Sequence, residues 1–139
     1  IYAIGDCSAH ENYFLGRRVR LESVPNAIEM ARVCAAAICG KPAAHNAVPW
    51  FWSDQYDLKL QMVGLSEGYD QIVFRGDVAK ESFCAFYLKQ GQLICADAVN
   101  RPQEFLVAKK LVAAKIKPSI EQLSDENLPL KSLEPAQTS

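Results

Sequence analysis

The chain has 139 residues, of which 50% are hydrophobic and 22% charged, a composition typical of globular proteins. Its net charge of −1 gives no field that would favour nucleic acid, and no run of about 18 apolar residues predicts a membrane span. The 5 cysteines form no C-x-x-C pair, which favours reduced thiols in a cytoplasmic protein and predicts no metal site.

Residues 1–44 are predicted to form a strand, a polar loop and a helix. Ile1 to Ile4 reads as a short buried strand, and because domains seldom open in mid-strand we expect a piece of a longer protein. The polar loop is expected to run from Cys7 to Val19. A helix should follow, with Ser23 as N-cap, Pro25 in its first turn and Gly40 and Pro42 at its end. Its expected apolar face is Ala27, Ala31, Cys34 or Ala35, and Ile38.

Residues 45–139 are predicted to form a second domain of antiparallel strands followed by a helix. Four runs alternate or cluster in the manner of strands, around residues 58–62, 72–74, 83–88 and 93–96, with a turn at 89–92. The helical period begins after Pro102 and ends before Pro118, and a final turn is expected at 124–127. The whole chain is therefore predicted to be α+β, with a domain boundary between residues 44 and 45.

Three segments carry residues that suit a cofactor. Gly5-Asp6 after a strand would place a carboxylate where cofactors bind at sheet edges, although an ordinary Asp turn fits equally. The helix start at Glu22-Ser23-Val24 would attract partial negative charge, or simply cap the helix. Trp50, Phe51, Trp52 and Tyr56 are expected in a loop, either as a core plug or as a platform for a planar ring. His10 and His45 lack ligand-spaced partners and are expected to face solvent.

Taken together, these segments resemble one family. The segment from Ile1 to Cys7 is similar to the second FAD signature of pyridine-nucleotide-disulfide-type flavoproteins. Further matches extend along the chain, namely residues 20–27, 49–56, Gly64-Leu65, 68–70, Arg75-Gly76 and 98–102. This order of motifs resembles the single-component ferredoxin reductases that serve bacterial cytochromes P450 and ring-hydroxylating oxygenases.

The resemblance implies an FAD-dependent enzyme that oxidises NADH and passes electrons to a [2Fe–2S] ferredoxin. It implies that Asp6 bonds the FAD ribityl chain, beside Gly5, which lets a ligand approach the backbone. It also implies that the backbone of Val24, next to Ser23, meets the flavin pyrimidine edge. Glu22 and Trp52 match positions beside the nicotinamide, with Trp50 close by. No side chain is expected to act as a nucleophile or obligatory acid–base, so no catalytic residue is assigned. The phosphate-binding G-x-G-x-x-G motifs of the family are absent, so the chain alone is expected to be inactive.

A basic patch for an acidic ferredoxin is expected at Arg32, Lys59 and Lys131. The other expected partners are the remaining FAD and NAD domains of the same protein. Two alternatives remain open at this point: a structural or ferredoxin-docking module without its own cofactor, and a reductase of the apoptosis-inducing-factor type. The segment Arg20 to Val24 favours the ferredoxin reductases over the latter, since the other branch tends to have histidines after the Glu.

Overall fold

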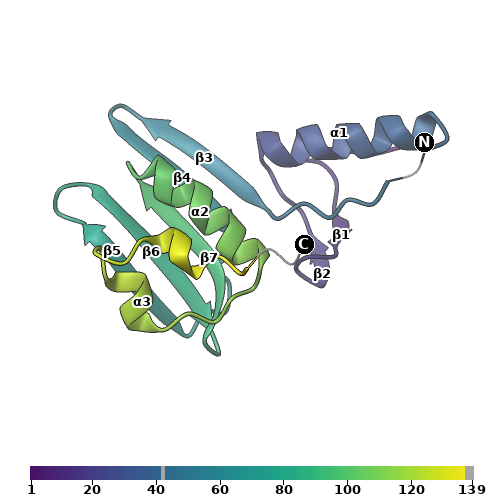
Figure 1. Cartoon of the computed structure of the whole chain (residues 1–139). Helices are drawn as coiled ribbons and strands as arrows, with labels where there is room; N and C mark the ends of the chain where they lie inside the picture. The colour runs from purple at the N-terminus through teal and green to yellow at the C-terminus, as the bar shows by residue number, and fades with distance from the viewer. Residues whose placement is uncertain (42, 137–139) are drawn as a thin grey trace. The chain divides into compact units, whose positions relative to one another are not determined.

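The computed structural model describes residues 1–41 and 43–136, so Pro42 lies outside the described residues. The chain divides into two compact units, Ile1–Phe51 and Trp52–Ser139, each of which is described by itself. The architecture is α+β, as predicted, and its main sheet is 5-stranded and antiparallel (Figure 1). The domain limits 1–44 and 45–139 stay a prediction. None of the described helices is long and apolar enough to cross a membrane.

The first unit contains a hairpin that the sequence analysis treated as loop. Strands β1 (His10–Asn12) and β2 (Arg17–Val19) pair antiparallel. Asn12 closes the turn, because its Oδ1 accepts a hydrogen bond from the Leu15 N–H at 3.0 Å and its carbonyl accepts one from Gly16 at 2.8 Å. Both strands are only three residues long and mostly polar, so they lack the apolar alternation that reveals a strand.

Helix α1 (Val24–Ile38) follows and begins as predicted. The Ser23 hydroxyl accepts a hydrogen bond from the Asn26 N–H at 3.3 Å, which satisfies one of the donors at the helix start. At the other end Gly40 has a φ of +71°, its N–H bonds the Ala37 carbonyl, and the Lys41 N–H bonds the Ala36 carbonyl at 2.8 Å. These two bonds form a Schellman motif, which explains why the helix stops before Gly40.

Two predictions for the first unit are wrong. Residues 1–4 are exposed and belong to no strand, because no described segment pairs with them and an unpaired extended segment cannot form a ladder. The buried side chains of α1 are Asn26 and Met30, whereas Ala31 is exposed and Ile38 is 68% exposed. The buried face is thus shifted by one residue from the predicted one, toward the turn at Gly5, whose N–H lies 3.4 Å from Met30 Sδ.

The second unit is built on the 5-stranded sheet in the order β3-β4-β7-β6-β5. All four predicted strands are confirmed, and β6 and β7 are joined by the predicted turn at Gln90-Gly91, where both residues have positive φ. The strands are β3 (Trp50–Gln55), β4 (Leu58–Gly64), β5 (Gln71–Asp77), β6 (Ser82–Lys89) and β7 (Gln92–Val99). The loop predicted for the aromatic segment is wrong, since Trp50 to Gln55 form an edge strand. Aromatic residues favour strands, and this preference outweighed Pro49.

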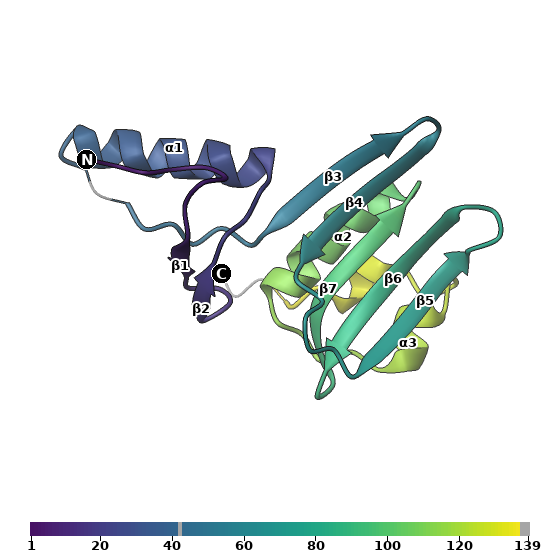
Figure 2. The same ribbon diagram turned by 180° about the vertical axis from the view of Figure 1, so that it is seen from behind.

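One face of the sheet is covered by helices, as the two opposite views in Figures 1 and 2 show. Helix α2 (Pro102–Ala113), which was predicted, packs on β7 and β4, and α3 (Ile120–Ser124) packs on β5. A 3-10 turn, η1 (Leu130–Leu133), packs on α2. The side chains buried between these layers include Val63, Phe86, Leu88, Leu93, Phe105, Leu111, Val112 and Leu123.

Arg75 holds the chain after α2 against the sheet. Its side chain is only 3% exposed, and its Nε donates to Glu104 Oε1 of α2 at 2.9 Å. The remaining guanidinium N–H groups donate to backbone carbonyls of Leu123 (3.3 Å), Asp125 (2.6 Å) and Leu128 (2.9 Å). One planar cation therefore joins β5, α2 and the segment after α3.

Asp97 is a half-buried charge, on the face of the sheet away from the helices. Its Oδ2 accepts a hydrogen bond from the Tyr87 hydroxyl at 2.8 Å, and its Oδ1 lies 3.9 Å from Cys95 Sγ. Burial raises the pKa of Asp97 above its ordinary value, while the hydrogen bonds from Tyr87 and Cys95 partly oppose that shift. Burial also raises the pKa of the Cys95 thiol, and the nearby Asp97 charge raises it further, so the thiolate form is disfavoured.

We predict that Arg75→Met destabilises the chain by roughly 3–5 kcal/mol, because it removes the buried ion pair with Glu104 Oε1 and the hydrogen bonds to three backbone carbonyls. Urea unfolding of the 139-residue chain measures the effect. Lys80→Met is the matched control, since the Lys80–Asp77 pair is 82% and 46% exposed and should contribute about 0–1 kcal/mol. Equal losses in the two variants would contradict the role of Arg75.

We also predict a pH dependence from Asp97. Because its folded pKa is raised, the stability it contributes is present below the unfolded value of about 3.9 and is lost as pH rises through the folded pKa. The free energy of unfolding of Asp97→Asn should therefore rise relative to that of wild type as pH increases through the window between the unfolded and folded pKa values of Asp97. Tyr87→Phe, which removes a hydrogen bond that lowers the pKa of Asp97, should extend the window upward. A difference between wild type and Asp97→Asn that is independent of pH would refute this assignment.

Candidate cofactor and docking site

The predicted residues Gly5 and Asp6 form a tight turn against α1. The Gly5 carbonyl accepts hydrogen bonds from the Ser8 hydroxyl at 2.8 Å and from the Ser8 N–H at 3.0 Å. Gly5 has a φ of +80°, which an L side chain rarely adopts, and a Cβ placed there would lie 4.0 Å from Ala27 Cβ. The turn leaves the Asp6 side chain exposed, so its carboxylate can accept hydrogen bonds from a ligand.

The segment before α1 lies beside the same turn. The Arg20 guanidinium donates to the Asp6 carbonyl at 3.4 Å and forms an ion pair with Glu22 at 2.6 Å. Val24, the first helical residue, is 56% exposed, so the positive end of the helix dipole opens to the surface. The structure therefore brings Gly5, Asp6, Glu22, Ser23 and Val24 together in the first unit, through the contacts of Arg20 and Met30.

This arrangement fits one side of a flavin. An exposed carboxylate suits the hydroxyls of a sugar-alcohol chain, and a helix start suits the electron-rich edge of a reduced ring. Asn26 Oδ1 adds a buried acceptor without a hydrogen-bond partner among the described residues, which sequence reasoning did not identify. An asparagine in a first helical turn gives no sequence signal of such burial. The chain contains no G-x-G-x-x-G, so a cofactor's phosphates would be held elsewhere.

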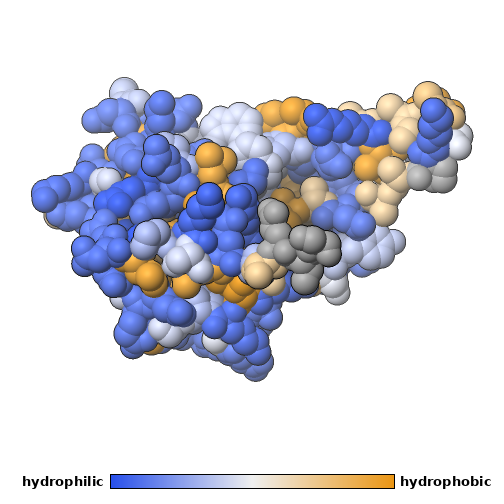
Figure 3. Space-filling view, viewed as in Figure 1, coloured by the Kyte–Doolittle hydropathy of each residue, from blue (hydrophilic) through white to orange (hydrophobic). Residues whose placement is uncertain are grey.

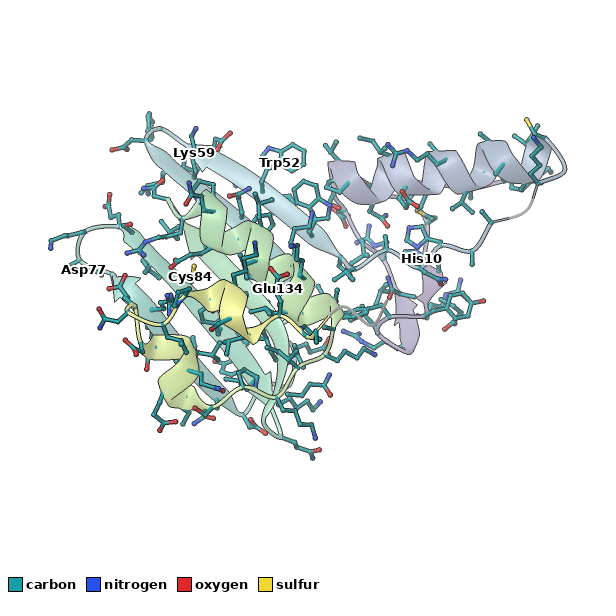
Figure 4. All side chains as sticks on the ribbon, viewed as in Figure 1. His10, Trp52, Lys59, Asp77, Cys84 and Glu134 are labelled. Carbon is teal, nitrogen blue, oxygen red and sulfur yellow. The ribbon has the colours of Figure 1, made fainter. Side chains whose placement is uncertain are left out.

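Trp50 and Trp52 lie on β3, two residues apart in a strand and therefore on the same face of it. Trp50 is half-buried and Trp52 is 38% exposed, so neither plugs a core. Figure 4 shows Trp52 on β3 and Lys59 on the neighbouring strand β4. Trp52 belongs to the second unit, so its position relative to Asp6 and Val24 stays a prediction.

The three predicted docking residues are all exposed. Arg32 has a side chain 74% exposed, and its Nη1 lies 3.3 Å from Glu29 Oε2, which offsets part of its charge. Lys59 is fixed through its backbone, which exchanges hydrogen bonds of 3.0 Å with Asn100. Lys131 lies in η1, which follows in sequence the segment whose carbonyls Arg75 binds. Arg32 belongs to the other unit, so a single patch formed by all three stays a prediction.

The two histidines do not face solvent, contrary to the prediction. Their rings meet edge to face, with centroids 4.4 Å apart, and their four nitrogens are buried without hydrogen-bond partners among the described residues. Burial lowers the pKa of His10, the charge of His45 lowers it further, and Glu11 opposes both. Within residues 1–41 and 43–136, no group of three or more His, Cys, Asp or Glu could hold a metal ion.

Comparison with known proteins gives one consistent result. Residues 50–134 match the family model described as "Reductase C-terminal". The ferredoxin reductase subunit of 5,5'-dehydrodivanillate O-demethylase from Sphingobium sp. is 50% identical over 99% of this chain and 34% of its own length. Putidaredoxin reductase from Pseudomonas putida is 47% identical over 96% of this chain and 32% of its own length. The chain thus spans about a third of the length of these relatives.

The same relationship holds in three dimensions. The crystal structure of the covalent complex of putidaredoxin reductase with putidaredoxin matches 94% of this chain and 31% of its own chain, with a TM-score of 0.87 and 47% identity. The match includes the 5-stranded antiparallel sheet with its helices, which confirms the predicted fold class. Since the family model covers residues 50–134, more than half of the chain, the chain belongs to the reductase C-terminal family.

Proposed function

We propose that this chain is the carboxy-terminal part of an FAD-dependent NADH:ferredoxin reductase that serves a cytochrome P450 or a ring-hydroxylating oxygenase. The observation that carries the proposal is the match over nearly the whole chain to ferredoxin reductases at close to 50% identity. When bound, FAD would take a hydride from NADH and release its two electrons singly to a [2Fe–2S] ferredoxin. The five free thiols fit a cytoplasmic setting for this protein.

The chain's own residues have positioning roles in this proposal. Asp6 would accept hydrogen bonds from the ribityl hydroxyls, because its carboxylate is exposed at a turn fixed by Ser8. The start of α1 at Ser23 and Val24 would stabilise negative charge on the flavin edge. Glu22, Trp50 and Trp52 would line the nicotinamide side. None of these groups transfers a proton in the proposal, and no catalytic residue is assigned.

The cofactor role of Asp6 has a direct test in the full-length reductase. Asp6→Ala would leave ribityl hydroxyls without their acceptor, at a cost of roughly 1–3 kcal/mol, so FAD affinity should fall by about one to two orders of magnitude. Equilibrium titration of the apoprotein with FAD gives the Kd. Asp57→Ala, in the turn between β3 and β4, is the control and should leave the Kd unchanged. An unchanged Kd for Asp6→Ala would make Asp6 an ordinary turn residue.

Docking of an acidic ferredoxin is tested by charge reversal. Arg32→Glu, Lys59→Glu and Lys131→Glu should each slow the reduction of ferredoxin by NADH and weaken its dependence on ionic strength. Lys80→Glu is the matched control, because Lys80 is also exposed and lies in the β5–β6 turn.

Reduction of ferricyanide by NADH in the same variants separates docking from cofactor chemistry. This small acceptor needs no protein surface, so its rate should stay at the wild-type value. Equal losses with ferredoxin and ferricyanide would assign the residues to folding or to the flavin. A full-length protein that oxidises NADH with neither acceptor would refute the proposed function itself.

A further inference from the structure

One thioether sulfur links the turn at Gly5 to helix α1. Met30 is one of the two buried residues of this helix and is 8% exposed. The Gly5 N–H donates to its Sδ at 3.4 Å, and the side-chain amide of Asn26 donates to the same atom at 3.3 Å. The Ser8 hydroxyl, which donates to the Gly5 carbonyl at 2.8 Å, lies 3.5 Å from the sulfur. Three polar groups from two parts of the chain therefore meet at one weak acceptor.

Hydrophobicity alone does not explain why Met30 is buried. Val24, Ile28 and Ile38 of the same helix are 56%, 49% and 68% exposed, and hydrophobic and hydrophilic surface alternate along α1 in Figure 3. The groups around the Met30 sulfur are instead an amide, a hydroxyl and a backbone N–H. A polarizable thioether can accept hydrogen bonds from such groups, whereas an aliphatic side chain cannot. Met30 therefore occupies a polar junction and not an apolar core.

The Gly5 peptide depends on these contacts for its orientation. Glycine has no side chain to pack, and at a φ of +80° its backbone is held here by hydrogen bonds. Ser8 holds the Gly5 carbonyl, and Arg20 holds the carbonyl of Asp6 at 3.4 Å. Met30 holds the remaining polar group, the Gly5 N–H. Without an acceptor this partly buried N–H would lose hydration and gain nothing in exchange, so the sulfur completes the set of contacts before the Asp6 carboxylate.

The same sulfur connects the turn to the start of α1. Asn26 lies in the first turn of the helix, four residues before Met30, and its amide donates to the Leu21 carbonyl at 2.9 Å as well as to the sulfur. A helix is regular over such a distance, so the position of Met30 along α1 is fixed relative to Val24. The contact between Met30 and Gly5 therefore sets how far the turn lies from the open end of the helix.

We propose that Met30 is a positioning residue of the flavin site, whose sulfur holds the Asp6 carboxylate at a fixed place relative to the start of α1. This inference rests on the proposed function, in which Asp6 binds the ribityl hydroxyls and Val24 meets the flavin edge. These two contacts act on parts of one cofactor, so an error in their spacing costs affinity even when both groups are present. Met30 touches no part of the cofactor in this proposal and acts only through the turn.

Replacement of the sulfur in the full-length reductase tests this role. Met30→Leu conserves apolar volume, which packed interiors usually tolerate, but removes the acceptor. The Kd of the apoprotein for FAD, measured by titration, should rise by roughly threefold to tenfold. Met30→Gln supplies a side-chain carbonyl as acceptor and should keep the Kd within about twofold of the wild-type value. Met62→Leu, in β4, is the matched control and should leave the Kd unchanged.

Two results of this titration would overturn the proposal. An unchanged Kd for Met30→Leu would show that the turn keeps its place without the sulfur. Equal weakening by Met30→Leu and Met30→Gln would assign Met30 to packing, because the loss would then not depend on whether an acceptor is present.

A double-mutant cycle separates positioning of Asp6 from a general effect on the site. If the sulfur acts through the Asp6 carboxylate, Met30→Leu should raise the Kd by less than about twofold when it is introduced into Asp6→Ala. Full additivity of the two effects would mean that Met30 acts independently of Asp6, and would overturn the proposal. Binding of FAD and reduction of ferredoxin by the wild-type full-length protein report on the proposed function separately. A wild-type protein that does both, beside a Met30→Leu variant with unchanged Kd, would refute the role of Met30 alone.

Discussion

A single buried guanidinium joins the segment around and after α3 to the sheet and to α2. Without Arg75, the segment from Leu123 onward would have few apolar contacts with which to hold its place, since Leu123 and Leu130 are its buried side chains among the described residues. Arg75 binds three of its carbonyls and reaches Glu104 on α2 at the same time. Because a guanidinium has five donors in one plane, it can satisfy several backbone groups that lie off any regular element. Loops of this kind otherwise leave buried carbonyls unpaired.

The features proposed to bind a cofactor or partner differ in kind between the two units. In the first, the features that suit a flavin are backbone features: a glycine turn at Gly5 and the open end of a helix at Val24. In the second, they are side chains displayed on strands, such as Trp52 and Lys59. Backbone dipoles are fixed once the helix forms, whereas exposed side chains on strands tolerate substitution.

Sequence reasoning succeeded where one local signal dominated. Helix α1 was predicted because Ser23, Pro25 and Gly40 mark its ends, and β4 because its leucines and Met62 alternate with polar residues. It failed at β3, where Pro49 and clustered aromatics resembled a loop until pairing with β4 was known.

The other errors share a cause, which is that the deciding contacts are distant in sequence. Nothing local to residues 1–4 could reveal that no strand pairs with them. The role of Arg75 likewise depends on groups up to 53 residues away, such as the Leu128 carbonyl. For the candidate site, the turn at Gly5 and the start of α1 were identified and lie together, whereas Asn26 and the histidine pair were not anticipated.

The strand order has a consequence for how the second unit opens. Strands β5, β6 and β7 are joined by successive hairpins, but β4 pairs with β7 across the entire β5–β6 hairpin. The β3–β4 hairpin is therefore attached to the rest of the sheet by the non-local ladder between β4 and β7 and by the packing of α2 on β4. Closing such a ladder costs more chain entropy than forming a hairpin, so the β3–β4 hairpin should pair with β7 late in folding and detach early in partial unfolding. Since Trp52 and Lys59 both lie on this hairpin, its detachment would remove an aromatic and a cation from the proposed site while β5, β6 and β7 stay paired.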